Sequence, residues 1–220
     1  MSNLGIEYIR TDIGSGKYFT KKISPANNTV YNFIKRAFDL LASLVAFIAA
    51  CIPMLIIAVL IKMDSRGGAI FKQERLGKDG KVFTMYKFRT MCENAEKDGA
   101  KWADADDDRC TRVGKYLRKV RFDELPQLVN IIKGDMSIVG PRPERPCFYD
   151  EFETYIEGFC QRLAVKPGLT GLAQVSGGYE LKPEEKIIFD LEYIEKRSIL
   201  MDIKIIFKTV AVVLGCKGAR

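Results

Sequence analysis

The stretch LLASLVAFIAACIPMLIIAVLI, from Leu40 to Ile61, contains 22 residues and no charged side chain. As an α-helix it would be about 33 Å long, enough to cross a hydrocarbon core of about 30 Å. A buried helix of a soluble protein is the alternative, but an uncharged run of this length is unusual for one. The stretch therefore predicts a membrane-inserted helix within residues 31–66.

Pro53 lies near the middle of this segment. Because proline has no N–H, it leaves the carbonyl of Ala49 without its helical partner and favours a kink. Basic residues flank both ends of the segment: Lys35, Arg36, Lys62 and Arg66. Since cytoplasmic flanks are the ones rich in Lys and Arg, we expect both ends on the cytoplasmic side. A re-entrant helix that breaks at Pro53 satisfies this pattern, and a kinked single span is the alternative.

The composition limits the chemistry of the rest of the chain. The 220 residues are 47% hydrophobic and carry a net charge of +7, which suits nucleic acid, anionic lipid or a phosphorylated substrate. There is no histidine, which excludes Ser-His and Cys-His catalytic pairs. The six cysteines form no CxxC pair, so we expect reduced thiols and no zinc site. Any catalysis must use carboxylates, Lys, Arg or a metal held by oxygen.

A β-hairpin is predicted directly after the apolar segment. The stretch AIFKQERLGKDGKVFTMYKFRTM has two strand-like runs around Asp79-Gly80, a good turn signal. Lys87 and Arg89 lie two residues apart near the end of the second strand and so share one face. They are candidate substrate-binding residues, and solvated charges on a strand edge are the alternative.

The acidic run DADDDR, Asp104 to Arg109, has the alternate spacing of a calcium loop but fails the rest of that pattern. Arg109 stands where glycine is needed and Lys115 where glutamate is needed. We interpret the run as a solvated acidic loop. A basic helix with Thr111 as its N-cap is predicted after it and leads directly to the next motif.

That motif is RFDELPQL, Arg121 to Leu128, which places Asp123 beside Glu124. The two acids have an ordinary explanation at a helix start, where Asp123 would be the N-cap and Gly134 would close the helix. They are also candidate catalytic residues. The capping and catalytic interpretations are compatible, because a helix N-terminus also favours a nearby phosphate.

Two further stretches are suited to phosphate binding. Arg142 lies between Pro141 and Pro143, so its backbone is restricted and its planar guanidinium could bind a phosphate with little further loss of freedom. A rigid surface turn is the alternative. The stretch KPGLTGLAQVSGG begins at Lys166 and includes Gln174, but it matches neither a Walker A nor a GxGxxG pattern.

Four motifs in order and spacing resemble one family, the bacterial sugar transferases, also called monotopic phosphoglycosyl transferases. They are KRAFD, FKQERLGKDGKVFTMYKFRTM, TRVGKYLRKVRFDELPQLVNIIKGDMSIVGPRPE and KPGLTGLAQVSG, within Tyr31 to Leu214. The family's frequent Ser-Pro at the helix break is Ile52-Pro53 here, so the proline must act without a serine hydroxyl.

The resemblance implies transfer of a sugar-1-phosphate from a UDP-sugar to undecaprenyl phosphate with release of UMP, the first membrane step of glycoconjugate assembly. It implies that Asp123 is the nucleophile, that Asp123 and Glu124 hold Mg²⁺, and that Arg118 and Arg142 bind substrate. Lys87, Arg89, Lys166 and Gln174 are further substrate-binding candidates. The expected partners are the UDP-sugar, undecaprenyl phosphate and the lipid bilayer, with a homodimer as a candidate assembly and no nucleic acid.

The expected fold class is α/β (α+β) and mainly helical. We predict a polar tail at 1–30, the re-entrant membrane helix at 31–66, a catalytic domain on the cytoplasmic face of the bacterial inner membrane at 67–180, and amphipathic interfacial helices at 181–220. The last stretch, Ile199 to Leu214, is short for a crossing and carries Asp202, Lys204 and Lys208. A packed core helix is the alternative there.

Two other functional classes remain open. A membrane-anchored nucleic-acid-binding protein would explain the positive charge, although no nucleic-acid motif is recognisable. A membrane phosphatase or nucleotidase that depends on Mg²⁺ would share the carboxylates but would need no polyprenyl phosphate acceptor. The sequence does not identify the sugar.

Overall fold

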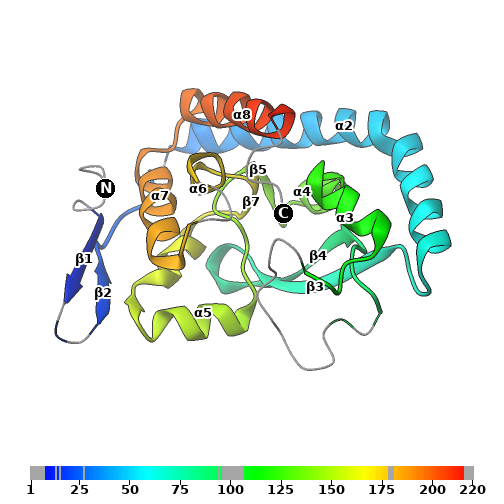
Figure 1. Ribbon diagram of the computed structural model, residues 1–220. Coiled ribbons are helices and arrows are strands. Elements are labelled where there is room, and N and C mark those ends of the chain that lie inside the picture. The colour runs from blue at the N-terminus through cyan, green and yellow to red at the C-terminus, as the bar shows by residue number, and fades with distance from the viewer. Residues whose placement is uncertain are drawn as a thin grey trace.

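The computed structural model describes residues 8–12, 14, 16–26, 28–93, 95, 107–177 and 181–215. The strands are β1 Ile9–Asp12, β2 Lys17–Thr20, β3 Ile70–Leu76, β4 Val82–Phe88, β5 Ser137–Val139, β6 Ile156–Glu157 and β7 Gly168–Thr170. The helices are α2 Thr29–Asp64, α3 Arg112–Lys119, α4 Gln127–Lys133, α5 Pro146–Glu153, α6 Leu172–Ser176, α7 Pro183–Lys196 and α8 Ile199–Leu214. The predicted mixed and mainly helical fold is confirmed (Figure 1).

Helix α2 contains the whole apolar stretch. It begins after Asn28, whose side chain accepts a hydrogen bond from the Tyr31 N–H, and runs for 36 residues with Pro53 inside it. Figure 1 shows that α2 passes behind α8 in this view and then turns sharply further along its length. By length and composition it could cross a membrane, and only 11% of its most apolar window is buried within the protein. A core helix of a soluble protein would be mostly covered, so the predicted membrane helix is the better description.

Both ends of α2 contact residues that follow it in the chain. Near its start, the Arg36 guanidinium donates to the carbonyls of Ile131 and Ile132 at the end of α4, with N–O distances of 2.7 and 2.9 Å. Near its other end, Ile57 and Ile61 are buried in a cluster with Phe88 and Leu117. The bend in α2 is what allows one helix to make both sets of contacts (Figure 1).

The predicted hairpin is confirmed. Strands β3 and β4 pair antiparallel from Ile70 opposite Phe88 to Leu76 opposite Val82. The turn uses positive φ at Asp79 (58°) and at Gly80 (74°), which is the conformation that Asp-Gly accepts readily. This hairpin carries Lys87 near its end.

Part of the predicted polar tail is structured. Strand β1 pairs antiparallel with β2, and β2 pairs parallel with β6. Tyr8 is fully buried among Tyr149, Phe152 and Leu191, and its hydroxyl donates to Glu195 at 2.7 Å. Burial of this aromatic ring explains why the segment is ordered although its composition is polar.

The two C-terminal helices have different environments. In α7, Ile187 and Leu191 belong to one core cluster and Tyr193 and Ile194 to another, so α7 is a core helix and differs from the predicted interfacial pair. In α8, Ile205 is buried, but Leu200, Ile203, Phe207 and Val210 are exposed. Helix α8 thus keeps the apolar outer face expected of an interfacial helix, while α7 does not.

Candidate active site

Asp123 and Glu124 lie in a short 3₁₀ turn, Phe122–Glu124, between α3 and α4. The turn follows Arg121, which has a left-handed backbone with φ of 58°. The capping alternative fails at the start of α4, because its N-cap position is Pro126 and no side chain caps it. Gly134 does close the helix, with φ of 94°. The two acids are therefore available for a purpose other than capping.

Glu124 is buried and held by two cations. Arg142 Nη2 lies 2.6 Å from Glu124 Oε1, and Lys87 Nζ lies 3.6 Å from the same oxygen. Burial alone would raise the pKa of Glu124, but Arg142 and Lys87 outweigh it and hold the pKa at about 2. Glu124 is therefore an anion at any physiological pH.

Asp123 has a different environment. Its side chain is half-buried and borders the cavity described below, and it has no hydrogen bond or ion pair with any residue that the structure describes. Burial and then the Glu124 charge raise its pKa to about 6, although Lys87, Arg142 and Arg118 oppose this. A carboxylate with a raised pKa is still largely ionised at pH 7 and is more nucleophilic than an ordinary one.

Lys87 completes this charged group from strand β4. Burial, followed by the nearby Arg142 charge, lowers the pKa of Lys87 to about 8, against the opposing effect of Glu124 and Asp123. Its ammonium is thus predominantly charged at neutral pH and faces both acids.

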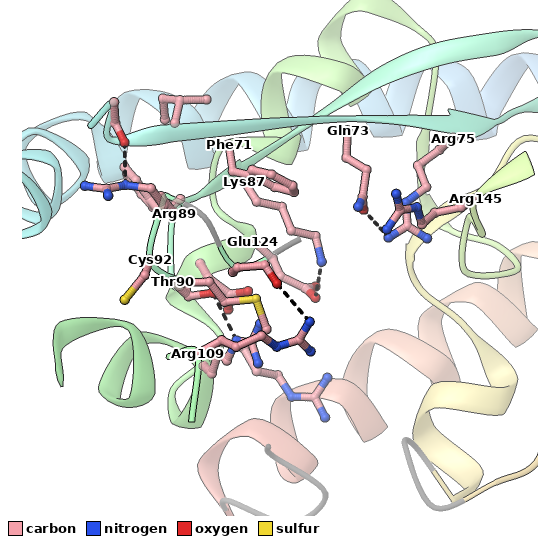
Figure 2. A pocket seen from close by; sticks show the side chains of 18 of the residues that line it. Phe71, Gln73, Arg75, Lys87, Arg89, Thr90, Cys92, Arg109, Glu124 and Arg145 are labelled. Atoms are coloured by element: carbon pink, nitrogen blue, oxygen red, sulfur yellow. Dashed lines mark hydrogen bonds and ion pairs between the residues drawn. The ribbon is translucent and has the colours of Figure 1, made fainter. Parts of the chain in front are cut away.

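These residues border a cavity of about 390 Å³. Nine Lys or Arg residues and four acids line it, so an anionic ligand is favoured. Figure 2 shows Lys87 and Glu124 in the middle, Arg75 and Arg145 at one end, and Arg89 and Cys92 at the other. The volume is in the range of pockets that hold small molecules.

The other predicted site residues differ in their position relative to the cavities. Arg118 and Arg89 line the main cavity, Gln174 lines a smaller one, and Lys166 lines neither. Arg118 lines the cavity, and its Nε donates to the Thr90 hydroxyl at 3.0 Å. Arg89 borders the cavity too, but its guanidinium donates to the carbonyls of Ser65, Arg66 and Gly68 at the end of α2. Arg89 therefore fastens α2 to the wall of the cavity.

Gln174 lines a smaller adjoining cavity together with Arg121 and Arg142, and its Nε2 donates to the Leu169 carbonyl at 3.0 Å. Lys166 lines neither cavity. It lies near Arg36 beside Gly134, at the opposite end of α4 from the acids. The structure does not support a role for Lys166 in this site.

The sequence interpretation missed Arg75, Arg145, Lys186 and Phe148, which also line the cavity. Arg75 lies on strand β3 of the predicted hairpin. Lys186 comes from α7, 62 positions after Glu124 in the chain, and no local pattern connects it with the acids.

The Asp123 and Glu124 carboxylates fit Mg²⁺ when water and substrate phosphate supply the remaining ligands. Among the described residues, no three His, Cys, Asp or Glu side chains form a metal site. Mg²⁺ in phosphoryl-transfer sites, however, is often held by one or two carboxylates, with water and substrate phosphate completing its shell. Both cations contact Oε1 of Glu124, and among the described residues neither Glu124 Oε2 nor the Asp123 carboxylate has a side-chain hydrogen bond.

Residues 30–216 match the family described as bacterial sugar transferase. The chain therefore belongs to the bacterial sugar transferase family, as the four motifs predict. It is 46% identical over 194 residues to an Aeromonas hydrophila protein named UDP-N-acetylgalactosamine-undecaprenyl-phosphate N-acetylgalactosaminephosphotransferase, covering 87% of this chain and 46% of that protein.

Two further relatives differ in length. A Klebsiella pneumoniae protein named UDP-glucose:undecaprenyl-phosphate glucose-1-phosphate transferase is 42% identical over 192 residues, which cover 85% of this chain and 41% of that protein. The exopolysaccharide production protein ExoY of Sinorhizobium fredii is 36% identical over 217 residues, covering 92% and 95%. The chain thus spans less than half of the Aeromonas and Klebsiella relatives but nearly all of ExoY.

Proposed function

We propose that this protein transfers a sugar-1-phosphate from a UDP-sugar to undecaprenyl phosphate and releases UMP. The observation that carries the proposal is the acid pair. Asp123 borders a cationic cavity, and Glu124 is held by Arg142 and Lys87. The names of the Aeromonas and Klebsiella relatives support the same reaction class. Those names differ in the sugar, so they do not select one for this chain.

The reaction proceeds in two displacements at one phosphorus atom. An Asp123 carboxylate oxygen attacks the β-phosphorus of the UDP-sugar, and the bond from that phosphorus to the bridging oxygen breaks, so UMP leaves with the electron pair. A phosphate oxygen of undecaprenyl phosphate then attacks the same phosphorus. The acyl–phosphate bond breaks, the Asp123 carboxylate is restored, and the lipid carries a diphosphate-linked sugar.

The cations bind and orient the phosphoryl group. Arg142 presents a planar fork suited to phosphate oxygens, and Arg118 and Lys87 add charge along the cavity. When Mg²⁺ is bound by Asp123 and Glu124, it would neutralise charge on the phosphate oxygens. Glu124 itself keeps Arg142 beside the reacting carboxylate.

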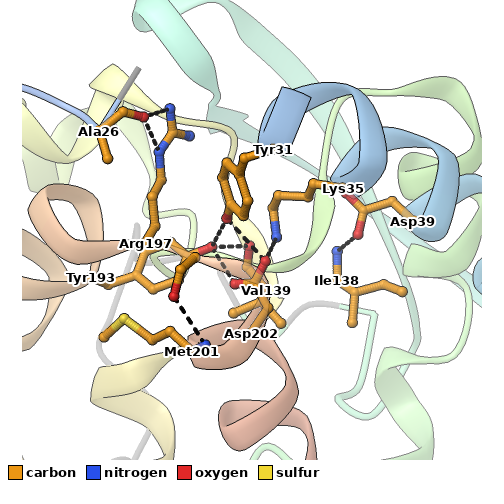
Figure 3. Close-up of polar contacts among 11 residues, drawn as sticks. Ala26, Tyr31, Lys35, Asp39, Ile138, Val139, Tyr193, Arg197, Met201 and Asp202 are labelled. Atoms are coloured by element: carbon orange, nitrogen blue, oxygen red, sulfur yellow. Dashed lines mark hydrogen bonds and ion pairs between the residues drawn. The ribbon is translucent and has the colours of Figure 1, made fainter. Parts of the chain in front are cut away.

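A re-entrant α2 is the second part of the proposal, with the domain on the cytoplasmic face of the inner membrane. Support comes from both ends of α2. Figure 3 shows Lys35 and Asp39, near its start, directed to Asp202 and Ile138, and at its end the Asp64 carboxylate accepts from the Val113 N–H at 3.1 Å. A helix held to one domain at both ends must return to the side that it entered. The exposed apolar face of α8 is suited to lie at the membrane surface.

The decisive experiment measures UMP release by purified protein with undecaprenyl phosphate, Mg²⁺ and a panel of UDP-sugars. We expect continuous release with one or a few donors, and only about one UMP per protein when the acceptor is left out. Continuous release without acceptor would instead identify a nucleotidase. Absence of release with every donor would refute the proposed reaction.

A further inference from the structure

The backbone of the Pro141–Arg142–Pro143 turn is fixed by two arginines from elsewhere in the chain. Arg162 Nη2 donates to the Arg142 carbonyl at 2.9 Å, and Arg75 Nη1 donates to the Pro143 carbonyl at 3.0 Å. The two prolines restrict φ on either side of Arg142, but they do not fix where the turn lies relative to Glu124. The two arginine contacts contribute to that placement, together with the Gly168 N–H, which donates to the Pro141 carbonyl at 2.9 Å.

Arg162 does this from a deeply buried position. It is 3% exposed, its Nε lies 2.7 Å from the Asp190 carboxylate on α7, and its guanidinium carbon lies 4.8 Å from the centre of the Phe159 ring. It does not line the main cavity, and with Asp190 it borders the smaller adjoining one. Its Nη2 atom is directed to the Arg142 carbonyl.

Stability alone does not explain the buried Arg162–Asp190 ion pair. Burying two charges removes their hydration, and a packed apolar pair of the same size is often equally stable or more stable. An arginine, however, can pair with a carboxylate through one nitrogen and donate to a carbonyl through another. The Arg162 guanidinium is held by Asp190 and by the rings of Tyr149 and Phe159. Its Nη2 atom therefore points to the Arg142 carbonyl.

We propose that Arg162, oriented by Asp190, is a positioning residue that holds the Arg142 guanidinium against Glu124. The path has three contacts: Asp190 to Arg162, Arg162 to the Arg142 carbonyl, and the Arg142 guanidinium to Glu124 at 2.6 Å. It extends the proposed function, on which it rests, because α7 thereby sets the geometry of the phosphate-binding side of the site. Arg75 supports the same turn from β3.

The test is a double-mutant cycle between positions 162 and 142. Arg162→Lys keeps a charge to pair with Asp190, but a single ammonium cannot also hold the Arg142 carbonyl in the same geometry. We expect it to lose about tenfold in kcat/KM, the scale of one charge-assisted hydrogen bond. In an Arg142→Lys background, the same change should cost less than about twofold, because its effect passes through Arg142. Equal losses in the two backgrounds would overturn the proposal.

The control for this cycle is Arg197→Met, and a second variant replaces both Arg162 and Asp190. Arg197 also donates through two nitrogens to a backbone carbonyl, that of Ala26, at 3.1 and 2.8 Å. The loss of kcat/KM in the Arg197→Met, Arg142→Lys double variant should equal the product of the two single losses, because Arg197 has no hydrogen bond to Arg142 in the part of the chain that the structure describes. If Arg162→Lys does not fold, Arg162→Met with Asp190→Leu removes both buried charges and should show the same dependence on Arg142.

A readout without turnover separates this inference from the proposed function. With ¹⁵N-labelled arginine side chains, the Arg142 signals can be assigned by their absence in Arg142→Lys. In the wild type they should show restricted rotation of the guanidinium, and in Arg162→Lys this restriction should be lost. If the wild type released no UMP, the proposed reaction would fail and these signals alone would decide the inference. Unchanged Arg142 signals in Arg162→Lys would overturn it.

Discussion

Asp123 and Glu124 are neighbours in the chain, but their carboxylates have opposite electrostatic environments. Glu124 is buried against Arg142 and Lys87, which lower its pKa to about 2, whereas burial and the Glu124 charge raise the pKa of Asp123 to about 6. The sequence indicates both acids but cannot separate their roles, because Arg142 lies 18 positions after Glu124. In the proposed mechanism, Asp123 is the nucleophile and Glu124 the fixed anion.

Asp123→Asn should abolish turnover, because an amide of the same shape cannot displace UMP from phosphorus. Wild-type protein mixed briefly with donor alone should gain the mass of one phospho-sugar, measured by intact-protein mass spectrometry. Peptide mapping should place that mass on Asp123.

Glu124→Gln is the companion variant. It should be strongly impaired, because Arg142 and Lys87 lose their shared counter-charge, but it should still form a small amount of adduct. An adduct mapped to another residue, or full activity in Asp123→Asn, would rule out the covalent mechanism.

Arg142→Lys tests whether charge alone is sufficient at the Pro-Arg-Pro turn. Lysine keeps the charge but loses the planar fork, so we expect kcat/KM to fall by more than about tenfold. Steady-state kinetics against the UDP-sugar measures this. Near wild-type kinetics would mean that the turn is only a rigid surface feature.

At the scale of elements, Asp202 at the start of α8 joins three helices. Its two carboxylate oxygens accept from Tyr193 of α7 at 2.8 Å, and from Tyr31 and Lys35 of α2 at 2.9 and 2.8 Å (Figure 3). Asp202→Ala should lower the free energy of unfolding by about 3–5 kcal/mol, because it leaves a partly buried ammonium without its partner. Thermal and denaturant unfolding in detergent micelles measures the loss.

The control for this prediction is the Lys21–Glu195 ion pair, whose side chains are 42% and 28% exposed. Lys21→Met should change stability by less than about 1 kcal/mol, as expected for a solvent-screened pair. Adding Lys35→Met to Asp202→Ala should recover part of the loss, since it removes the orphaned charge. Additive losses would show that the Lys35–Asp202 contact contributes little.

Elements defined by local patterns could be predicted, and those that depend on distant contacts could not. The hairpin followed from Asp79-Gly80 and the apolar helix from its length. The β1–β2 pair was missed because its stability comes from Tyr8 packing against α5 and α7, far along the chain. Lys166 heads a glycine-rich stretch that matches no established phosphate-loop pattern, and only the fold shows that it lies near Arg36 and lines neither cavity.

At the scale of the whole molecule, the cavity lies close to the end of the apolar helix. Arg89 donates to the Ser65 and Gly68 carbonyls just after α2, and the next residue, Thr90, accepts from Arg118 at the cavity wall. In the proposed topology, a ligand anchored in the bilayer would present its phosphate to the site without leaving the membrane. This arrangement requires the domain to lie on one face of the membrane, which depends on the path of α2.

Pro53→Ala tests that path. Alanine restores the missing N–H and favours a straight span, so a fraction of the variant should place its N-terminus in the periplasm. The fraction should be limited, because a straight span must break the contacts of Lys35 and Arg36 with the domain. Combining Pro53→Ala with Asp202→Ala should therefore raise it. The measurement uses single cysteines, Ser2→Cys or the native Cys92, in an otherwise cysteine-free chain, labelled in intact cells with an impermeant thiol reagent.

The wild-type protein provides the critical comparison in this experiment. With a re-entrant α2, neither Ser2→Cys nor Cys92 should be labelled from outside, and both should be labelled after the cells are opened. Labelling of Ser2→Cys alone in intact cells would show a true crossing, and the contacts at one end of α2 would then have to be absent in the membrane. The acid pair would be unaffected by that result, since Lys87, Arg118 and Arg142 all come from the domain that follows α2.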